Sequence, residues 1–173
     1  TEWSVTPLQP DISEAIAIEN KRLNISPTAN DLGSRNLIEQ TQTLYWYPSE
    51  VDVSIRPGWF YHPEQDHQVK SLAQLVDIYF LSVGMNSVLL LNVPPDTRGR
   101  LHEVDVERLR QFGTYIASTF ENEKLIDGEI LWKARSGASK EYHVRAGEII
   151  NTVMLQEDIR KGQRVEKFLV EGF

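Results

Sequence analysis

A strand–helix–strand pattern in the middle of the sequence constrains the fold more than any other feature. Residues 72–83 carry apolar side chains at helical spacing, which predicts an amphipathic helix. Residues 87–93 (SVLLLNV) form a nearly continuous apolar run, a pattern typical of a parallel strand that is buried on both faces. Residues 44–54 alternate and are rich in β-forming side chains, so we expect most of them in a strand. This order and the length of the connection predict a β-α-β unit and therefore an α/β fold.

The flanking sequence indicates how the chain is divided. Helices are predicted over residues 11–23 and 105–120, and Gly84 is expected to give the central helix a left-handed C-terminal cap. Short β-like runs separated by turn residues follow beyond Asn122, namely 128–134, 141–145, 149–156 and 165–170. This change from helical patterns to short β-like runs predicts a boundary near residues 120–128, with an α/β part over 1–122 and the start of an antiparallel β-sandwich over 123–173.

Composition excludes several classes of function. The net charge of −7 and the absence of a basic stripe argue against binding to nucleic acid. The apolar run over residues 87–93 is far too short to cross a bilayer. The chain has no cysteine, so neither disulfides nor thiolate metal sites are available.

The stretch WYPSEVDVSIRPGWFYH (residues 46–62) combines aromatic rings, carboxylates and a guanidinium at the end of the first predicted strand. If the α/β part is a slice of a barrel, this stretch and residues 92–96 (NVPPD) follow the carboxyl ends of strands, where functional residues gather. Aromatic faces and carboxylates suit a sugar, and paired carboxylates could also perform glycosidic acid/base chemistry.

Plainer interpretations of the same residues stay open. The alternating aromatic residues could simply pack in a strand. Glu50 and Asp52 share a strand face by their spacing, and such a pair is more often a solvated edge than a catalytic dyad. A metal site can be imagined at residues 62–67 (HPEQDH), but a solvated polar turn is several times more common there.

The same stretch, followed by KSLAQLVDIYFLSVGMNSV and LLLNVPPDTRG, closely resembles the α-L-fucosidases of glycoside hydrolase family 29. The similarity is greatest to the bacterial branch that prefers α-1,3/1,4-linked fucose, and it covers roughly residues 1–115. Residues 150–173 are similar to the opening of that family's C-terminal β-sandwich. The resemblance implies the C-terminal portion of a (β/α)8-like, TIM-type catalytic barrel over 1–122, followed by the beginning of the sandwich over 123–173.

The activity implied by the resemblance is retaining exo-hydrolysis of terminal α-L-fucose from fucosylated oligosaccharides or glycoconjugates, through a covalent fucosyl–enzyme intermediate and without a cofactor or metal. The aspartate nucleophile, and in this branch the glutamate acid/base as well, are expected upstream of Thr1. The chain should therefore be active only with the N-terminal remainder of the barrel. Family resemblance also suggests a periplasmic or extracellular bacterial protein, and it leaves the linkage preference open.

The resemblance assigns roles to residues in this chain. Trp59 is expected to pack against the apolar edge of fucose, including its C6 methyl group. Three further residues are expected in the surrounding shell or on the leaving-group side, namely Asp52, Arg56 and His62. Asn92 is expected to face the barrel mouth. Glu50 and Glu2 are fallback candidates for the acid/base, with a supporting polar role favoured for Glu50.

Two other functions remain compatible with the sequence. A catalytically inactive, carbohydrate-binding homologue would keep Trp59 and the pocket but lack the upstream aspartate. A purely structural β/α scaffold would use the aromatic strand as core, and it would bury Trp59 away from any pocket.

Overall fold

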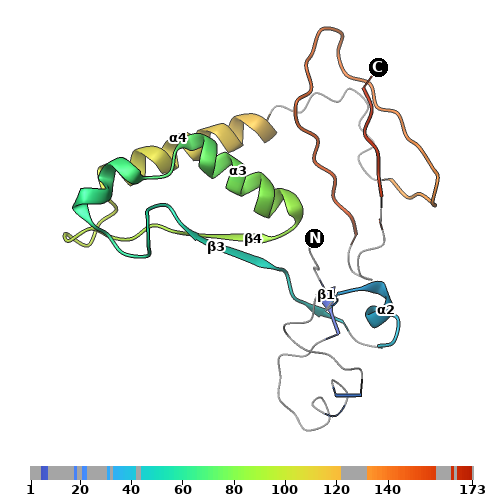
Figure 1. Ribbon diagram of the computed structural model, residues 1–173. Helices are drawn as coiled ribbons and strands as arrows, with labels where there is room; N and C mark the ends of the chain where they lie inside the picture. The colour runs from blue at the N-terminus through green and yellow to red at the C-terminus, as the bar shows by residue number, and fades with distance from the viewer. Residues whose placement is uncertain are drawn as a thin grey trace.

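The computed structural model describes residues 5–7, 18, 21–22, 31, 33–41, 44–121, 132–158, 165 and 167–172 (Figure 1). Its centre is a β-α-β unit in which β3 (Glu50–Ser54) and β4 (Val88–Asn92) pair in parallel. The register joins Glu50 to Val88 at one end and Ser54 to Asn92 at the other. The predicted β-α-β unit is therefore confirmed.

The connection between the two strands contains the helix expected from the apolar stripe. The 3₁₀ helix η1 (Pro63–Gln68) leads into α3 (Leu72–Ser82) and a short turn, η2 (Val83–Met85). A capping box starts α3: the Ser71 hydroxyl accepts a hydrogen bond from the Gln74 amide at 3.2 Å, and the Gln74 side chain accepts one from the Ser71 amide at 2.8 Å. These two bonds satisfy amides that the first turn of a helix leaves unpaired.

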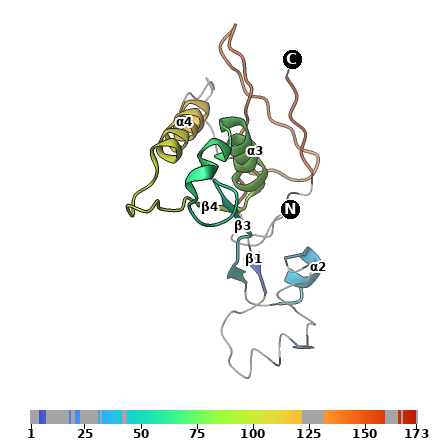
Figure 2. The same ribbon diagram turned by 60° about the vertical axis from the view of Figure 1, so that its left-hand side comes forward.

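The second helix, α4 (Glu103–Phe120), follows β4 and packs against α3. Figures 1 and 2 show both helices on the same side of the β3–β4 pair. Aromatic rings of the two helices meet between them, with Tyr79 to Phe112 at 6.0 Å and Phe80 to Phe120 at 6.4 Å between ring centroids. Leu75 is buried on α3. The apolar stripe predicted for residues 72–83 thus packs against α4.

Three details differ from the sequence-based expectation. The strand expected over residues 44–54 is interrupted by residues 47–49, which include Pro48, so it divides into β2 (Tyr45–Trp46) and β3. The left-handed residue after α3 is Asn86 (φ 68°), not Gly84, because η2 carries the helical turn two residues further. β4 is not buried on both faces: Val88 and Leu90 are exposed because the described helices cover only the other face of the pair.

The N-terminal part contains two short elements. β1 (Val5–Thr6) pairs antiparallel with β2, and α2 (Arg35–Ile38) is capped by the Ser34 hydroxyl, which accepts from the Leu37 amide at 3.3 Å. The helix predicted over residues 11–23 lies largely outside the described residues.

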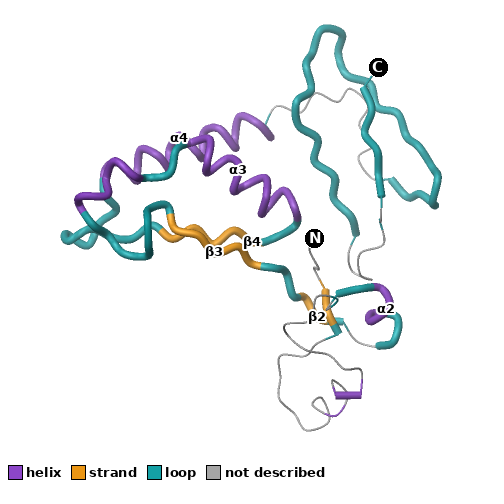
Figure 3. Tube along the Cα trace, in the orientation of Figure 1, coloured by secondary structure: helices purple, strands orange, loops and turns teal. Residues whose placement is uncertain are grey.

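The C-terminal runs do not form the strands expected from their composition. In residues 132–158, 165 and 167–172 the structure contains only an isolated bridge at Val144, and Figure 3 draws this part as loop. Many of its apolar side chains are exposed, including Ile149 and Leu169. β-like runs of this kind need neighbouring strands to bury one face, and the described residues provide none for them. The run over 128–134 falls largely outside the described residues, and the β-sandwich stays a prediction.

Candidate functional site

The carboxyl ends of β3 and β4 lie side by side and form the edge from which the predicted site would be built. Beyond the last register pair, the Ile55 amide donates to the Asn92 carbonyl at 2.9 Å, and the Ile55 side chain is fully buried. Lys70 returns to the same edge, where its Nζ donates to the Ser54 carbonyl at 2.6 Å and its amide donates to the Ile55 carbonyl at 2.9 Å. The chain leaving β3 is therefore fixed on both sides before it enters the aromatic loop.

Trp59 stands in that loop with its side chain half-exposed, at 51% of its surface. Gly58 precedes it with φ 71°, a left-handed conformation that glycine adopts at low cost. The Asn92 Nδ2 donates to the Trp59 carbonyl at 3.2 Å and to the Ser54 Oγ at 3.0 Å. One side chain from β4 thus connects the strand end to the backbone of the exposed tryptophan. A half-exposed ring on a fixed loop can serve as a stacking platform for a ligand.

Arg56 lies in the interior beneath this loop instead of on its surface. Only 1% of the residue is exposed. Its Nε donates to both Asp105 carboxylate oxygens, at 2.8 and 3.0 Å, and its Nη1 donates to Asp66 at 2.8 Å. The guanidinium also lies 4.8 Å from the centroid of the Tyr61 ring. We call Arg56, Tyr61, Asp66, His102 and Asp105 the arginine cluster.

The carboxylates of the arginine cluster stabilise the charged form of Arg56. Burial alone would lower the pKa of Arg56, but the hydrogen bonds to Asp105 and Asp66 outweigh it and hold that pKa above its ordinary value. Burial and the Asp66 charge raise the pKa of the Tyr61 hydroxyl. His102 lies beside the pair, with its Nε2 3.6 Å from an Asp66 oxygen and its ring 5.6 Å from the Tyr61 ring. The cluster joins the end of β3, η1 and the first turn of α4.

The other predicted site residues do not all gather at this edge. His62 follows the loop and is exposed, with its Nδ1 3.8 Å from Glu64. Asp52 is exposed on the strand face that also carries Ser54. Glu50 begins β3 and pairs with Val88, so it lies four residues, or about 13 Å, from the Ser54 edge. Glu50 is therefore at the end of the strand opposite Trp59. Glu2 lies outside the described residues.

A further polar loop follows β4, beginning in residues 92–96 (NVPPD), which the sequence pattern placed after the carboxyl end of a strand. The buried Asp96 accepts from the Arg98 side chain at 2.6 and 2.9 Å and from the backbone amides of Arg98 and Arg100. The hydrogen bonds from Arg98 lower the pKa of Asp96 to about 2. Gly99, with φ 72°, closes the turn. Asp96 thus stabilises its own loop, as a side chain that accepts backbone amides commonly does.

Asp66 and Asp105 were not identified from the sequence as partners of Arg56. Residues 62–67 were interpreted as a solvated turn or, less commonly, a metal site, yet Asp66 is the partner of a buried arginine. Among the described residues, no group of three His, Asp or Glu side chains could hold a metal ion. An acidic residue in the first turn of a predicted helix was the one visible signal for Asp105, and its partner is 49 residues away in sequence.

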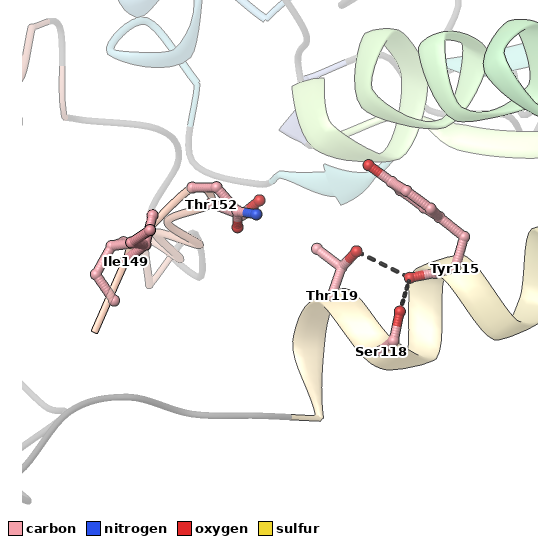
Figure 4. A pocket seen from close by; sticks show the side chains of 7 residues that line it. Tyr115, Ser118, Thr119, Ile149 and Thr152 are labelled. Atoms are coloured by element: carbon pink, nitrogen blue, oxygen red, sulfur yellow. Dashed lines mark hydrogen bonds between the residues drawn. The ribbon is translucent and has the colours of Figure 1, made fainter. Parts of the chain in front are cut away.

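A separate hollow of about 310 Å³ lies between the end of α4 and residues 149–152 (Figure 4). Ser118 and Thr119 line it, but both hydroxyls donate to the Tyr115 carbonyl of their own helix, at 2.9 and 2.8 Å. Tyr115 is ten residues beyond Asp105, which is about 15 Å along α4. The hollow is therefore distinct from the carboxyl edge.

No helix in the described part of the chain is both long and apolar enough to span a membrane.

These features define an α/β protein whose parallel strands present an aromatic loop at their carboxyl edge, the arrangement on which barrel enzymes build their active sites. The family model for alpha-L-fucosidase matches residues 3–121. The chain belongs to this family, the α-L-fucosidases of glycoside hydrolase family 29, and it is therefore a glycoside hydrolase homologue. The resemblance to this family is confirmed, and the bacterial branch that prefers α-1,3/1,4-linked fucose stays a prediction.

Individual relatives agree with this assignment. The chain is 52% identical to a candidate alpha-L-fucosidase from Bacteroides ovatus of known crystal structure, with a TM-score of 0.70 over 84% of this chain and 25% of that one. It is 35% identical to "Putative alpha-L-fucosidase 1" of Oryza sativa subsp. japonica, over 73% of this chain and 30% of the rice protein. It is 48% identical to Alpha-L-fucosidase 1 of Arabidopsis thaliana, over 44% of this chain and 15% of the plant protein. The chain thus spans less than a third of the length of these relatives.

Proposed function

We propose that this chain supplies the Trp59 side of the fucose pocket in a retaining α-L-fucosidase. The observation that carries the proposal is the position of Trp59, half-exposed at the carboxyl edge of two parallel strands and tied to β4 through Asn92. Fucose offers an apolar edge with its C6 methyl group, and an indole face matches that edge well. His62 and Asp52 belong to the surrounding shell or to the leaving-group side of the same pocket.

The two catalytic carboxylates come from chain outside these 173 residues. The Asp66, Asp96 and Asp105 carboxylates are each engaged with an arginine, which disfavours proton transfer or nucleophilic attack by them. Glu50 lies about 13 Å from the carboxyl edge. The chain also covers only 25% of its Bacteroides ovatus relative, which leaves ample sequence for both groups.

In the proposed reaction the nucleophilic aspartate attacks the anomeric carbon while the glutamate protonates the departing glycosidic oxygen. Water, activated by the same glutamate, then cleaves the fucosyl–aspartate ester and gives back fucose with its original anomeric configuration. Trp59 touches non-reacting atoms throughout both steps. It therefore contributes binding energy equally to the ground state and to the transition state.

The proposal includes the architecture of the complete protein. Residues 1–122 are the C-terminal part of a (β/α)8-like catalytic barrel, and residues 123–173 open the β-sandwich. The substrate is a fucosylated oligosaccharide or glycoconjugate, and the N-terminal remainder of the barrel is the chain's structural partner. The family suggests a periplasmic or extracellular location.

The test is hydrolysis of 4-nitrophenyl α-L-fucoside by the complete polypeptide and by its Trp59→Ala variant. Loss of the indole should lower kcat/KM by about 10- to 100-fold, because a buried aromatic contact contributes a few kcal/mol to binding. Trp132→Ala is a matched control, since Trp132 is 49% exposed and lies far along the chain. It should leave kcat/KM unchanged.

Two outcomes would contradict the proposal. Release of no fucose by the complete polypeptide would exclude the enzyme, and fucose binding without hydrolysis would favour the inactive, carbohydrate-binding homologue. Proton NMR of the first-formed sugar tests the mechanism separately: α-fucose appears first if the enzyme retains configuration.

A further inference from the structure

We infer that Arg56 is a positioning residue that fixes the Trp59 loop and makes no direct contact with the sugar. The inference rests on the proposed function of Trp59 and extends it to the arginine cluster. It revises the expectation that Arg56 belongs to the shell around fucose.

The burial of Arg56 is the first step. A guanidinium that binds a hydroxyl of a substrate must reach the surface of the pocket, whereas the Arg56 side chain is entirely buried and the Trp59 side chain, three residues on, is half-exposed. Two of its three nitrogens are already engaged by carboxylates on other elements. Among the described residues the third, Nη2, is buried and has no partner.

The elements joined by Arg56 are the second step. Asp66 belongs to η1, which follows the loop, and Asp105 belongs to the first turn of α4. Residues 57–61 leave Arg56 and return toward the same group, since the Tyr61 ring lies 4.8 Å from the guanidinium. Both ends of the segment that carries Trp59 are therefore fixed to one side chain. Asn92 holds its middle through the Trp59 carbonyl.

The geometry also explains why arginine stands at this position. Its planar fork donates to two carboxylates on different elements at once, from Nε and from Nη1. Lysine carries a single ammonium on a flexible stem and does not reproduce such a fork. An Arg56→Lys change keeps the charge but should release one of the two anchors, so the loop would sample other positions while the helices stay folded.

The experiment compares Arg56→Lys and Asp66→Asn in the complete polypeptide, with Arg110→Lys as the control. Arg110 also pairs with a carboxylate on α4, at 2.8 Å from Glu107, but the pair is exposed and remote from the loop. Two readouts are used: KM and kcat for 4-nitrophenyl α-L-fucoside, and the ¹⁹F NMR signal of 5-fluorotryptophan at position 59. The signal is assigned from the Trp59→Phe variant.

Positioning predicts that both cluster variants broaden or split the Trp59 signal. KM should rise about tenfold in Arg56→Lys and about threefold in Asp66→Asn, with kcat within about twofold, because stacking on non-reacting atoms is lost equally in the ground state and the transition state. Arg110→Lys should change neither readout. Asp66→Asn keeps the test decisive if Arg56→Lys does not fold.

Three results would overturn the inference. A lower melting temperature with an unchanged Trp59 signal and unchanged KM would mean that the cluster is only structural. A higher KM in Arg56→Lys alone, with Asp66→Asn and the Trp59 signal unaffected, would mean direct sugar contact. An unchanged Trp59 signal in both cluster variants would also refute the positioning role of Arg56, even if the protein cleaves no fucoside. That result is separate from a failure of the proposed function, which appears as an inactive wild-type enzyme.

Discussion

Asn92 offers a sharp test of how the carboxyl edge works, because one amide group serves two different purposes. Its Nδ2 bond to Ser54, at 3.0 Å, joins the ends of the two strands, and its bond to the Trp59 carbonyl, at 3.2 Å, holds the loop. We expect Asn92→Ala to weaken both stability and substrate binding, in proportions that the structure specifies.

A hydrogen bond of this kind contributes about 1 kcal/mol net, so Asn92→Ala should reduce the free energy of unfolding by about 2 kcal/mol. Only the share that belongs to the Trp59 carbonyl, about 1 kcal/mol, affects the loop. If the substrate must then order that loop on binding, KM should rise about fivefold. The change in kcat should be smaller than the change in KM.

Ser54→Ala is the matched control for this prediction. It removes the acceptor on the strand, together with the long 3.4 Å bond that Ser54 Oγ accepts from the Arg56 amide, but it leaves the bond from Asn92 to Trp59. Stability should fall while KM stays within about twofold of the wild-type value. Steady-state kinetics on an aryl α-L-fucoside and urea unfolding of the complete polypeptide give the two quantities. Equal increases in KM for both variants, or none for Asn92→Ala, would refute the assignment of the Trp59 bond to the loop.

Three further predictions concern the segments around the site. The pKa of Asp96 is lowered from 3.8 to about 2, so its paired carboxylate stabilises the fold above about pH 4, and that contribution is lost as the pH falls toward 2. In acid unfolding curves, the stability difference between wild type and Asp96→Asn should therefore shrink over this range. A difference that does not depend on pH would contradict the pairing of Asp96 with Arg98. Gly84→Ala should raise stability by about 0.5–1 kcal/mol, because Gly84 has no positive φ and an added Cβ would meet Phe80 at an ordinary 3.5 Å. Gly58→Ala should lower stability by about 1 kcal/mol despite open space around it, because φ is 71° there. Urea unfolding measures both glycine variants, and effects of the same sign would show that backbone conformation does not decide them.

The central fold could be predicted from the sequence because its signals are local. The apolar stripe over residues 72–83 specifies a helix by its periodicity, and the continuous apolar run over 87–93 specifies a strand. The strand–helix–strand order then specifies a parallel pair. The end of α3 was predicted at the wrong residue because Gly84 and Asn86 both suit a left-handed cap and only the 3₁₀ turn η2 decides between them. The exposure of one face of β4 could not be predicted from its composition, because burial of that face depends on which elements pack against it.

The candidate site was predictable only for residues whose exposure does not depend on partners that are distant in the sequence. Trp59 follows a strand end and the Pro57–Gly58 turn, a local signal that favours an exposed aromatic residue. Arg56 has the same local signal but is buried, because its partners lie 10 and 49 residues away in sequence. No periodicity in the chain indicates that pairing. Charged residues near a strand end can therefore be proposed as site residues from sequence, but their burial has to come from the structure.

The strand face that carries Glu50, Asp52 and Ser54 connects these points to the complete enzyme. The register places Val88 and Leu90 opposite Glu50 and Asp52, and both apolar side chains are about half-exposed on the face turned away from α3 and α4. In a parallel barrel this face is the interior, where further strands bury such side chains. Since the chain covers 25% of its Bacteroides ovatus relative, we expect the remaining barrel strands to cover Val88 and Leu90. Asp52 would then lie in the barrel interior, on the strand face that carries Ser54 at the carboxyl edge, whereas Glu50 would lie toward the opposite end of the barrel, where residues serve stability.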